Sequence, residues 1–99
     1  MTITDLSQRI QARDGAAVVL YSKPNCQPCR MTKKKLDAAS IYYTEVDVST
    51  DQTALEYVKG LGYAGVPVLY VSTIEGDIHW QGLDLDRIRD HITHRADAA

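Results

Sequence analysis

The sequence predicts a single α/β domain over residues 1–99, in which a mixed four-stranded sheet carries helices on both faces. Three observations lead to this class. A chain of 99 residues has room for one domain of the usual size, about 100–200 residues. Short apolar runs alternate with segments of helical period, which calls for parallel strands joined by right-handed helical crossovers. The last two apolar runs are separated only by a turn, and so form an antiparallel hairpin.

The four strands are predicted from short runs rich in β-branched and aromatic residues. The first run, Ala-Ala-Val-Val-Leu-Tyr, has no polar alternation, which is typical of a strand buried on both faces. The third begins at Val66-Pro67, and proline is tolerated at the first residue of a strand. The strands are expected at residues 16–21, 42–48, 66–71 and 78–80, with a turn at 73–77 between the last two.

Four helices are predicted from apolar residues spaced three and four positions apart, which places them on one helical face. The pattern Ser49-x-x-Gln52 is a capping box and predicts the start of the third helix. Asp84 stands in the N-cap position of the last helix. The apolar faces are expected to carry Leu6 and Ile10 in a short extra helix at 4–13, Cys29, Thr32, Leu36 and Ala39 at about 26–39, Leu55, Val58 and Leu61 in the third helix, and Leu85, Ile88 and Ile92 in the last.

Composition and charge exclude several classes of protein. With a formal net charge of −2 and a pI of about 5.8, the chain lacks the basic excess of a nucleic-acid binder. No apolar run approaches the roughly 20 residues that cross a bilayer, and the first residues lack the basic-then-apolar pattern of a signal peptide. Two cysteines in 99 residues are too few for a disulfide-built secreted scaffold. We therefore expect a cytoplasmic protein with no nucleic-acid or membrane partner.

The motif that carries chemistry is Cys26-Gln27-Pro28-Cys29, at the junction of the first strand and the second helix. A C-x-x-C motif in this βαβ setting is typical of a redox pair. Cys26 would stand at the helix N-terminus, where unpaired N–H groups and the positive end of the helix dipole favour a thiolate. Cys29, one turn inside, would be shielded. The pattern therefore predicts that Cys26 attacks a disulfide and that Cys29 resolves the mixed disulfide.

Basic residues crowd around this motif. Five of the eleven Lys and Arg residues lie between positions 23 and 35, with no acid among them. They are Lys23, Arg30, Lys33, Lys34 and Lys35. A positive field lowers the pKa of a thiol and steers an acidic partner toward it. The alternative is an ordinary solvated helix face, which applies more to Lys34 and Lys35 than to Lys23 and Arg30, the residues that flank the motif.

Three other interpretations of the cysteines stay open beside the redox pair. A structural disulfide across so short a loop would stabilise the fold by only about 2 kcal/mol. A zinc-binding interaction module needs about four ligands. The other ligand candidates are His79, His91 and His94. Two buried thiols without a role are the third interpretation. We expect no metal and no tightly bound cofactor.

Several stretches, taken together in their order and spacing, resemble a known family. They are Tyr21 to Cys26, Cys29 with Thr32 to Asp37, Tyr43 with Val46 to Val48, Leu61 to Tyr63, Val66 to Val68, and Trp80-x-Gly82. Over residues 17–93 the chain is similar to the thioredoxin superfamily in its short, glutaredoxin-like form. It is more closely similar to the NrdH-type redoxins, which deliver electrons to class Ib ribonucleotide reductase. The resemblance implies a thioredoxin fold and a dithiol–disulfide oxidoreductase; the helix at 4–13 lies outside the family core.

The resemblance also implies roles for individual residues. Cys26 would be the nucleophile, Cys29 the resolving thiol and Lys23 a neighbour of the nucleophile. Pro67 would be a cis-proline that faces the pair. Val66 would offer backbone hydrogen bonds to an extended segment of the substrate.

Departures from neighbouring groups bear on the source of electrons. Leu20 stands where thioredoxins have a buried acid, and Asn25 where they have tryptophan. Residues by which glutaredoxins bind glutathione are replaced in Gln27-Pro28, Gly65-Val66-Pro67 and Gln81-Gly82-Leu83-Asp84-Leu85. The resemblance therefore implies that thioredoxin reductase reduces the pair, and that the substrate is a protein disulfide, with ribonucleotide reductase as the family's own target. The alternative is a glutathione-dependent glutaredoxin. Asp84 replaces an arginine of the NrdH-type group.

Four residues near the pair are candidates for contact with a partner. They are Arg30, Tyr63, Trp80 and Gly82. For Trp80 and Tyr63 the alternative is a half-buried side chain that covers the core, because large aromatic residues are highly buried on average. Nothing in the sequence demands an oligomer, and we expect a monomer.

Overall fold

The computed structural model describes residues 16–93, and the helix predicted at 4–13 lies outside them. Within this part of the chain, four strands form one sheet in the order β2-β1-β3-β4. β1 (Ala16–Ser22) pairs in parallel with β2 (Thr44–Asp47), β3 (Val68–Thr73) runs antiparallel to β1, and β4 (Gly76–Gln81) runs antiparallel to β3. The predicted mixed sheet is confirmed.

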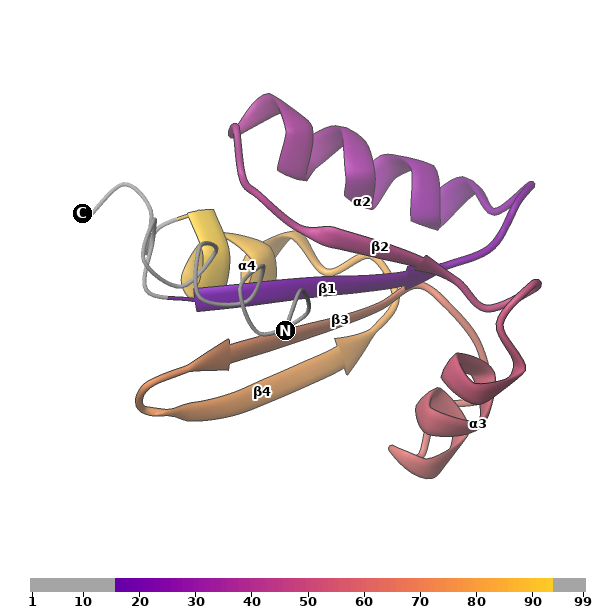
Figure 1. The fold of residues 1–99 in the computed structure, drawn as a ribbon. Coiled ribbons are helices and arrows are strands. Elements are labelled where there is room, and N and C mark those ends of the chain that lie inside the picture. The colour runs from indigo at the N-terminus through magenta and orange to yellow at the C-terminus, as the bar shows by residue number, and fades with distance from the viewer. Residues whose placement is uncertain (1–15, 94–99) are drawn as a thin grey trace.

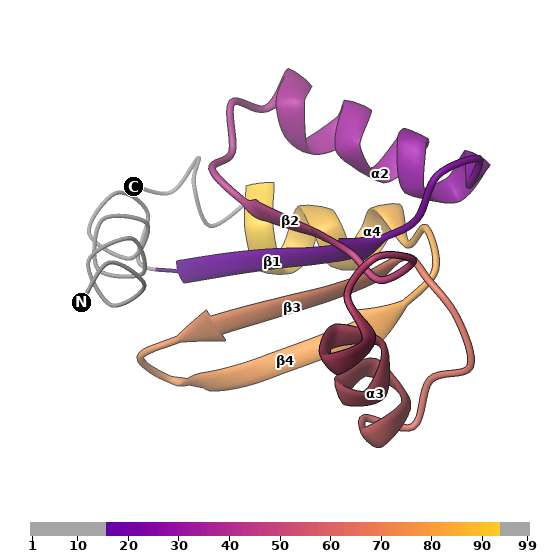
Figure 2. The same ribbon diagram turned by 45° about the vertical axis from the view of Figure 1, so that its right-hand side comes forward.

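Helices cover both faces of this sheet, as the sequence predicts (Figures 1 and 2). α2 (Gln27–Ala38) and α4 (Leu85–Ile88) lie on one face, and α4 continues into a π-helical turn, η1 (Arg89–Thr93). α3 (Gln52–Gly60) lies on the other face, at the end of the sheet where β1 and β2 finish. In the described part of the chain, no helix is long and apolar enough to cross a bilayer.

Two apolar cores form on the two faces of the sheet. The core that includes residues of α2 and α4 consists of Val18, Leu20, Leu36, Ile41, Leu69, Val71, Trp80, Ile88 and Ile92. The core that includes residues of α3 consists of Val48, Ala54, Val58 and Val68, with the partly buried Tyr21, Val46, Leu55, Tyr63 and Val66 packed against it. The central strand β1 contributes to both, which explains why its run of apolar residues is unbroken.

The edges of all four strands differ from the prediction, β1 only by one added residue, Ser22. β3 begins at Val68 rather than Val66, because Pro67 has no N–H to give and its carbonyl oxygen accepts the Gly82 amide at 2.7 Å. β2 is shorter than predicted, since only Thr44–Asp47 pairs with β1. β4 is longer, because the hairpin pairing extends to Gly76, next to the turn.

The N-cap of α3 is Asp51, not Ser49. The Asp51 carboxylate accepts the Ala54 amide at 3.0 Å. Ser49 instead donates both its amide and its hydroxyl to the Asp47 carboxylate, at 2.8 and 2.6 Å. Both residue types are good caps, so the sequence pattern alone did not separate them.

The last helix begins where predicted, but its first turn is more exposed than expected. The Asp84 carboxylate accepts the Arg87 amide at 3.0 Å and so caps the helix. Ile88 and Ile92 are buried as predicted, whereas Leu85 is 52% exposed because it lies beside α2 at the start of the helix, not above the sheet. Ala39, also expected on a buried face, is exposed because α2 ends one residue before it.

A polar contact ties α2 to the end of the sheet that carries the cysteines. Ser22, only 2% exposed, donates its hydroxyl to the Glu45 carboxylate at 2.7 Å. Lys33 of α2 lies 3.0 Å from the same carboxylate oxygen. The Ser22 hydrogen bond, together with Lys33, holds the pKa of Glu45 below its ordinary value of 4.5 against a smaller opposing effect of burial.

Replacing Asp51 by Ala should cost about 1 kcal/mol of unfolding free energy, because the Ala54 amide loses its acceptor. For a domain of this size, the melting temperature should fall by roughly 4–8 °C. Ser49→Ala is the matched control and should cost less than half as much. Thermal unfolding followed by circular dichroism measures both, and a larger loss for Ser49→Ala would contradict the assignment of the cap.

Replacing Glu45 by Gln should remove part of the pH dependence of stability. Because the pKa of Glu45 is lower in the folded than in the unfolded chain, its charge stabilises the fold above pH 4.5. That contribution is lost as the pH falls through the lowered value. Urea unfolding should therefore find Glu45→Gln less stable than the native chain at pH 7, with the gap closing below pH 4.5. A gap of the same size at acid pH, or the same behaviour in the exposed Glu56→Gln control, would contradict this.

Candidate active site

The chain turns sharply from β1 into α2, and this turn places Cys26. Asn25 adopts a left-handed conformation with φ of 58°, which Asn tolerates better than most residues with a side chain. Cys26 then takes an extended conformation as the N-cap of α2, and Pro28 stands in the first turn, where a missing N–H costs nothing. The sequence therefore fixes the first cysteine at the helix N-terminus, as predicted.

Cys26 and Cys29 are joined as a disulfide, with their Cα atoms 5.2 Å apart. This separation is within the usual range for such bonds. Cys26 is 8% exposed and Cys29 1% exposed. Cys29 is the more shielded of the two, as predicted, although Cys26 is also largely buried. Only one sulfur is therefore within reach of a partner.

A backbone N–H at the start of α2 donates to the Cys26 sulfur. The Cys29 amide donates to this sulfur at 3.3 Å, so the sulfur satisfies one of the unpaired N–H groups at the start of α2. The first turn carries no acidic residue. A hydrogen-bond donor and the positive end of a helix dipole are the surroundings that generally favour a thiolate.

The basic residues predicted to surround the pair divide into different environments. Lys23 is exposed in the turn before Cys26. Arg30 donates to the side-chain oxygen of Gln27 at 2.7 Å, and both are exposed. Lys33 is paired with Glu45, an acid on β2 that lies outside the basic stretch between positions 23 and 35. Because the charge of Lys33 is paired, fewer unpaired positive charges surround the cysteines than the sequence suggests.

The loop before β3 faces the cysteines. The Val66–Pro67 peptide bond is cis, as the family resemblance implies, and the Pro67 side chain is fully buried. The carbonyl oxygen of Val66 lies 4.0 Å from the Cys26 sulfur. Gly82 is tied to the same loop, since its amide donates to the Pro67 oxygen at 2.7 Å. The structure thus brings Val66, Pro67 and Gly82 to the edge of the cysteine pair.

Trp80 and Tyr63 are not equally placed for contact with a partner. Trp80 is 3% exposed and belongs to the core that includes α2 and α4 residues, so its side chain is not part of the surface. Tyr63 is partly buried, and its hydroxyl lies 2.8 Å from the Nδ1 atom of His79 and 3.1 Å from the His79 carbonyl oxygen. This contact fastens the loop that carries Pro67 to β4. The core interpretation therefore holds for Trp80.

Two groups near the site were missed by the sequence analysis. Ser22 and Glu45 form the polar contact beneath α2, and Tyr63 and His79 anchor the loop before β3. Successive side chains of β1 point to opposite faces of the sheet, so Ser22 shares the face of the buried Leu20. A polar side chain buried on that face needs a partner, and this is a sequence signal for the contact between Ser22 and Glu45. The Tyr63–His79 contact joins two segments distant in sequence and has no such signal.

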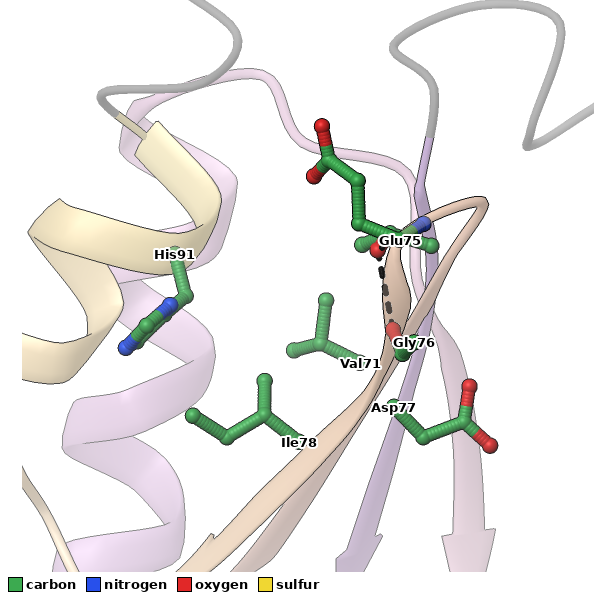
Figure 3. A pocket seen from close by; sticks show the side chains of 7 residues that line it. Val71, Glu75, Gly76, Asp77, Ile78 and His91 are labelled. Carbon is green, nitrogen blue, oxygen red and sulfur yellow. Dashed lines mark hydrogen bonds between the residues drawn. The ribbon is translucent and has the colours of Figure 1, made fainter.

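A hollow at the far end of the sheet bears on the zinc interpretation. His91 lies across it from Val71 and Ile78, beside the β3–β4 turn at Gly76 (Figure 3). The cysteines lie at the opposite end of β3, a strand that spans roughly 17–20 Å. Residues 16–93 contain no group of three or more His, Cys, Asp or Glu side chains that could hold a metal ion. His94 lies outside these residues.

Comparisons with known proteins agree with this geometry. The glutaredoxin family model matches residues 18–74. The Gene 56 protein of Mycobacterium phage L5 is 38% identical over 79 residues, which cover 79% of this chain and 77% of that protein. The glutaredoxin-like protein NrdH of Lactococcus lactis subsp. cremoris is 35% identical over 52 residues, 52% of this chain and 72% of that protein.

The fold has solved counterparts as well. The glutaredoxin-like NrdH-redoxin of Escherichia coli superposes with a TM-score of 0.66 at 24% identity, over 75% of this chain and 92% of that one. The sheet order, the cysteine pair at the start of α2 and these matches lead to one conclusion. The chain belongs to the glutaredoxin family, among the NrdH-type redoxins of the thioredoxin superfamily, which are thiol–disulfide oxidoreductases with a C-x-x-C pair.

Proposed function

We propose that this protein reduces protein disulfides, with Cys26 as the attacking thiolate and Cys29 as the resolving thiol. The observation that carries the proposal is the placement of the Cys26 sulfur at the N-cap of α2. There it accepts the Cys29 amide at 3.3 Å and is the more exposed of the two sulfurs. A donor aimed at a sulfur that can be reached is what a nucleophilic thiolate requires.

The reaction follows from this arrangement. The Cys26 thiolate attacks one sulfur of the partner's disulfide, which breaks, and the partner's other sulfur leaves as a thiolate. Cys29 then loses its proton and attacks the Cys26 sulfur of the mixed disulfide, so that the second partner sulfur leaves. The partner gains two electrons and two protons, and Cys26–Cys29 becomes the disulfide seen in the structure. Two electrons from a reductase restore the dithiol.

The substrate segment is proposed to lie along the loop before β3. Val66 lies beside the Cys26 sulfur and is only partly buried, so its backbone is available to an extended chain. Lys23, Gln27 and Pro28 are exposed around the sulfur and form the rest of the rim. Such encounters between redox partners bury little surface, which suits repeated association and release.

Thioredoxin reductase is proposed as the source of electrons, with NADPH as their origin. The residues by which glutaredoxins hold glutathione are replaced here, and the side chain of Gln27, inside the cysteine motif, is bound to Arg30. Ribonucleotide reductase, the target that the resemblance to the NrdH-type redoxins implies, is proposed as a substrate. We further propose that the protein acts as a monomer in the cytoplasm, where thiols are kept reduced.

Single serine substitutions should separate the two cysteines. Cys26→Ser should lower the reduction of insulin disulfides to the uncatalysed rate, because no attacking thiolate remains. Cys29→Ser should stop after the first step and accumulate a mixed disulfide between Cys26 and the substrate. Mass spectrometry under non-reducing conditions identifies this adduct. Normal turnover of protein disulfides by Cys29→Ser, without added thiol, would contradict the dithiol mechanism.

A coupled assay should identify the electron source. With an insulin substrate, NADPH should be oxidised when thioredoxin reductase is present, and at least tenfold more slowly with glutathione and glutathione reductase, because the glutathione-binding residues are replaced. The Cys26→Ser variant is the blank for both couples. Turnover with glutathione alone would identify the protein as a glutathione-dependent glutaredoxin.

A further inference from the structure

An open groove runs along α2 beside the proposed active site. It is lined by Met31, Lys34, Lys35 and Ala38 of α2 and by Leu83 and Leu85 of the opposite wall. Its volume is about 260 Å³. Sites for whole small molecules usually span about 300–1,000 Å³. The groove therefore fits one or two side chains of a larger partner better than it fits a cofactor.

The groove gathers apolar side chains that are exposed to solvent. Met31, Leu83 and Leu85 are 41%, 39% and 52% exposed. A single exposed apolar side chain needs no explanation, but three that face one hollow form a patch of the kind that binds a partner. Leu85 is also the residue that the helical pattern places in the core and the structure does not.

Positive charge borders this apolar patch. Within residues 16–93, neither Lys34 nor Lys35 has an ion-pair partner. The acids of the opposite wall are already paired with arginines of their own helix, as Asp84–Arg87 and Asp86–Arg89. The groove therefore presents two unpaired ammonium groups beside apolar surface, which is complementary to a segment that is both acidic and apolar.

One end of the groove lies a short distance along α2 from Cys26. Met31 follows Cys26 by five positions, which is about 7.5 Å along a helix axis. On the other wall, Leu83 follows Gly82, whose amide is bound to the Pro67 oxygen. A chain that places its disulfide at Cys26 and its backbone at Val66 can therefore reach the groove within two or three residues.

We propose that this groove binds a segment of the protein substrate next to its disulfide, and that this segment carries one or two large apolar side chains flanked by Asp or Glu. The inference rests on the proposed function and adds the class of substrate. Met31, Leu83 and Leu85 receive the apolar side chains. Lys34 and Lys35 attract the carboxylates and raise the rate of encounter.

Synthetic peptides with one intramolecular disulfide test the proposal. One peptide carries an extension of alternating Leu and Glu next to the disulfide, and a second carries an extension of Gly and Ser. Both peptides are made in two versions, one with the extension N-terminal to the disulfide and one with it C-terminal. The quantity measured is the ratio of the two kcat/KM values within each protein variant, so any effect on the cysteines themselves cancels. Bis(2-hydroxyethyl) disulfide, which is small and neutral, reports the chemistry alone.

The native chain should prefer the Leu-Glu peptide by about tenfold or more. The double variant Lys34→Glu with Lys35→Glu should bring the ratio to one or below, and 0.5 M salt should weaken the native preference. Leu85→Ser should lower the ratio about threefold or more, with the same dependence on salt as the native chain. Lys59→Glu on α3 and Ile74→Ser in the hairpin turn are matched controls and should keep the native ratio, because both residues are exposed away from the groove.

Two results would overturn the proposal. One is a native chain that reduces all the peptides at equal rates, which leaves the proposed function standing because the neutral disulfide is still reduced. The other is a dimer, found by sedimentation at assay concentrations, that Leu85→Ser dissociates, since the groove would then bind a second copy of this chain. Failure of the native chain to reduce even the neutral disulfide would instead contradict the proposed function.

Discussion

The hydrogen bond from the Cys29 amide to the Cys26 sulfur is the interaction on which the proposed function of this domain depends. The first N–H groups of a helix have no partner within the helix, and a short polar side chain usually satisfies one of them. Here a sulfur takes that place, although it accepts hydrogen bonds more weakly than the oxygen of Asp or Ser. In the proposed function, the weaker cap is offset because the same N–H stabilises the Cys26 thiolate once the disulfide is reduced.

The rest of the structure holds this junction in place. Buried side chains of α2, including Leu36, pack against the central strand β1. The Ser22–Glu45–Lys33 contact fixes the same helix to the ends of β1 and β2 with charge-assisted hydrogen bonds. The loop before β3 is fixed from the other side by Tyr63. A site that presents one sulfur and hides another needs such support, because its geometry depends on how the neighbouring elements hold α2.

The sequence predicts the parts of this fold that depend on local pattern. The mixed sheet follows from the alternation of strands and helices along the chain, most of the buried helix residues follow from periodicity, and the place of Cys26 follows from the strand–helix junction. The errors arise where two local patterns compete or where a distant residue decides. Ser49 and Asp51 are equally good caps, and the neighbouring Asp47 draws Ser49 away. Leu85 fits the apolar period but begins its helix beside α2. The partner of Lys33 is Glu45 on β2, and no local sequence pattern around Lys33 indicates this pairing.

In the proposed function, one helix serves two tasks that place different demands on its surface. Its N-terminus activates a sulfur, and this depends on backbone N–H groups that every sequence has. Its outer side carries Met31, Lys34 and Lys35, and the properties of that surface depend on which side chains the sequence supplies. Changes along the outer side can therefore alter the choice of partner while the thiol chemistry persists. Asp84, which stands where the NrdH-type group has arginine, fits this division, because it caps α4 and pairs with Arg87.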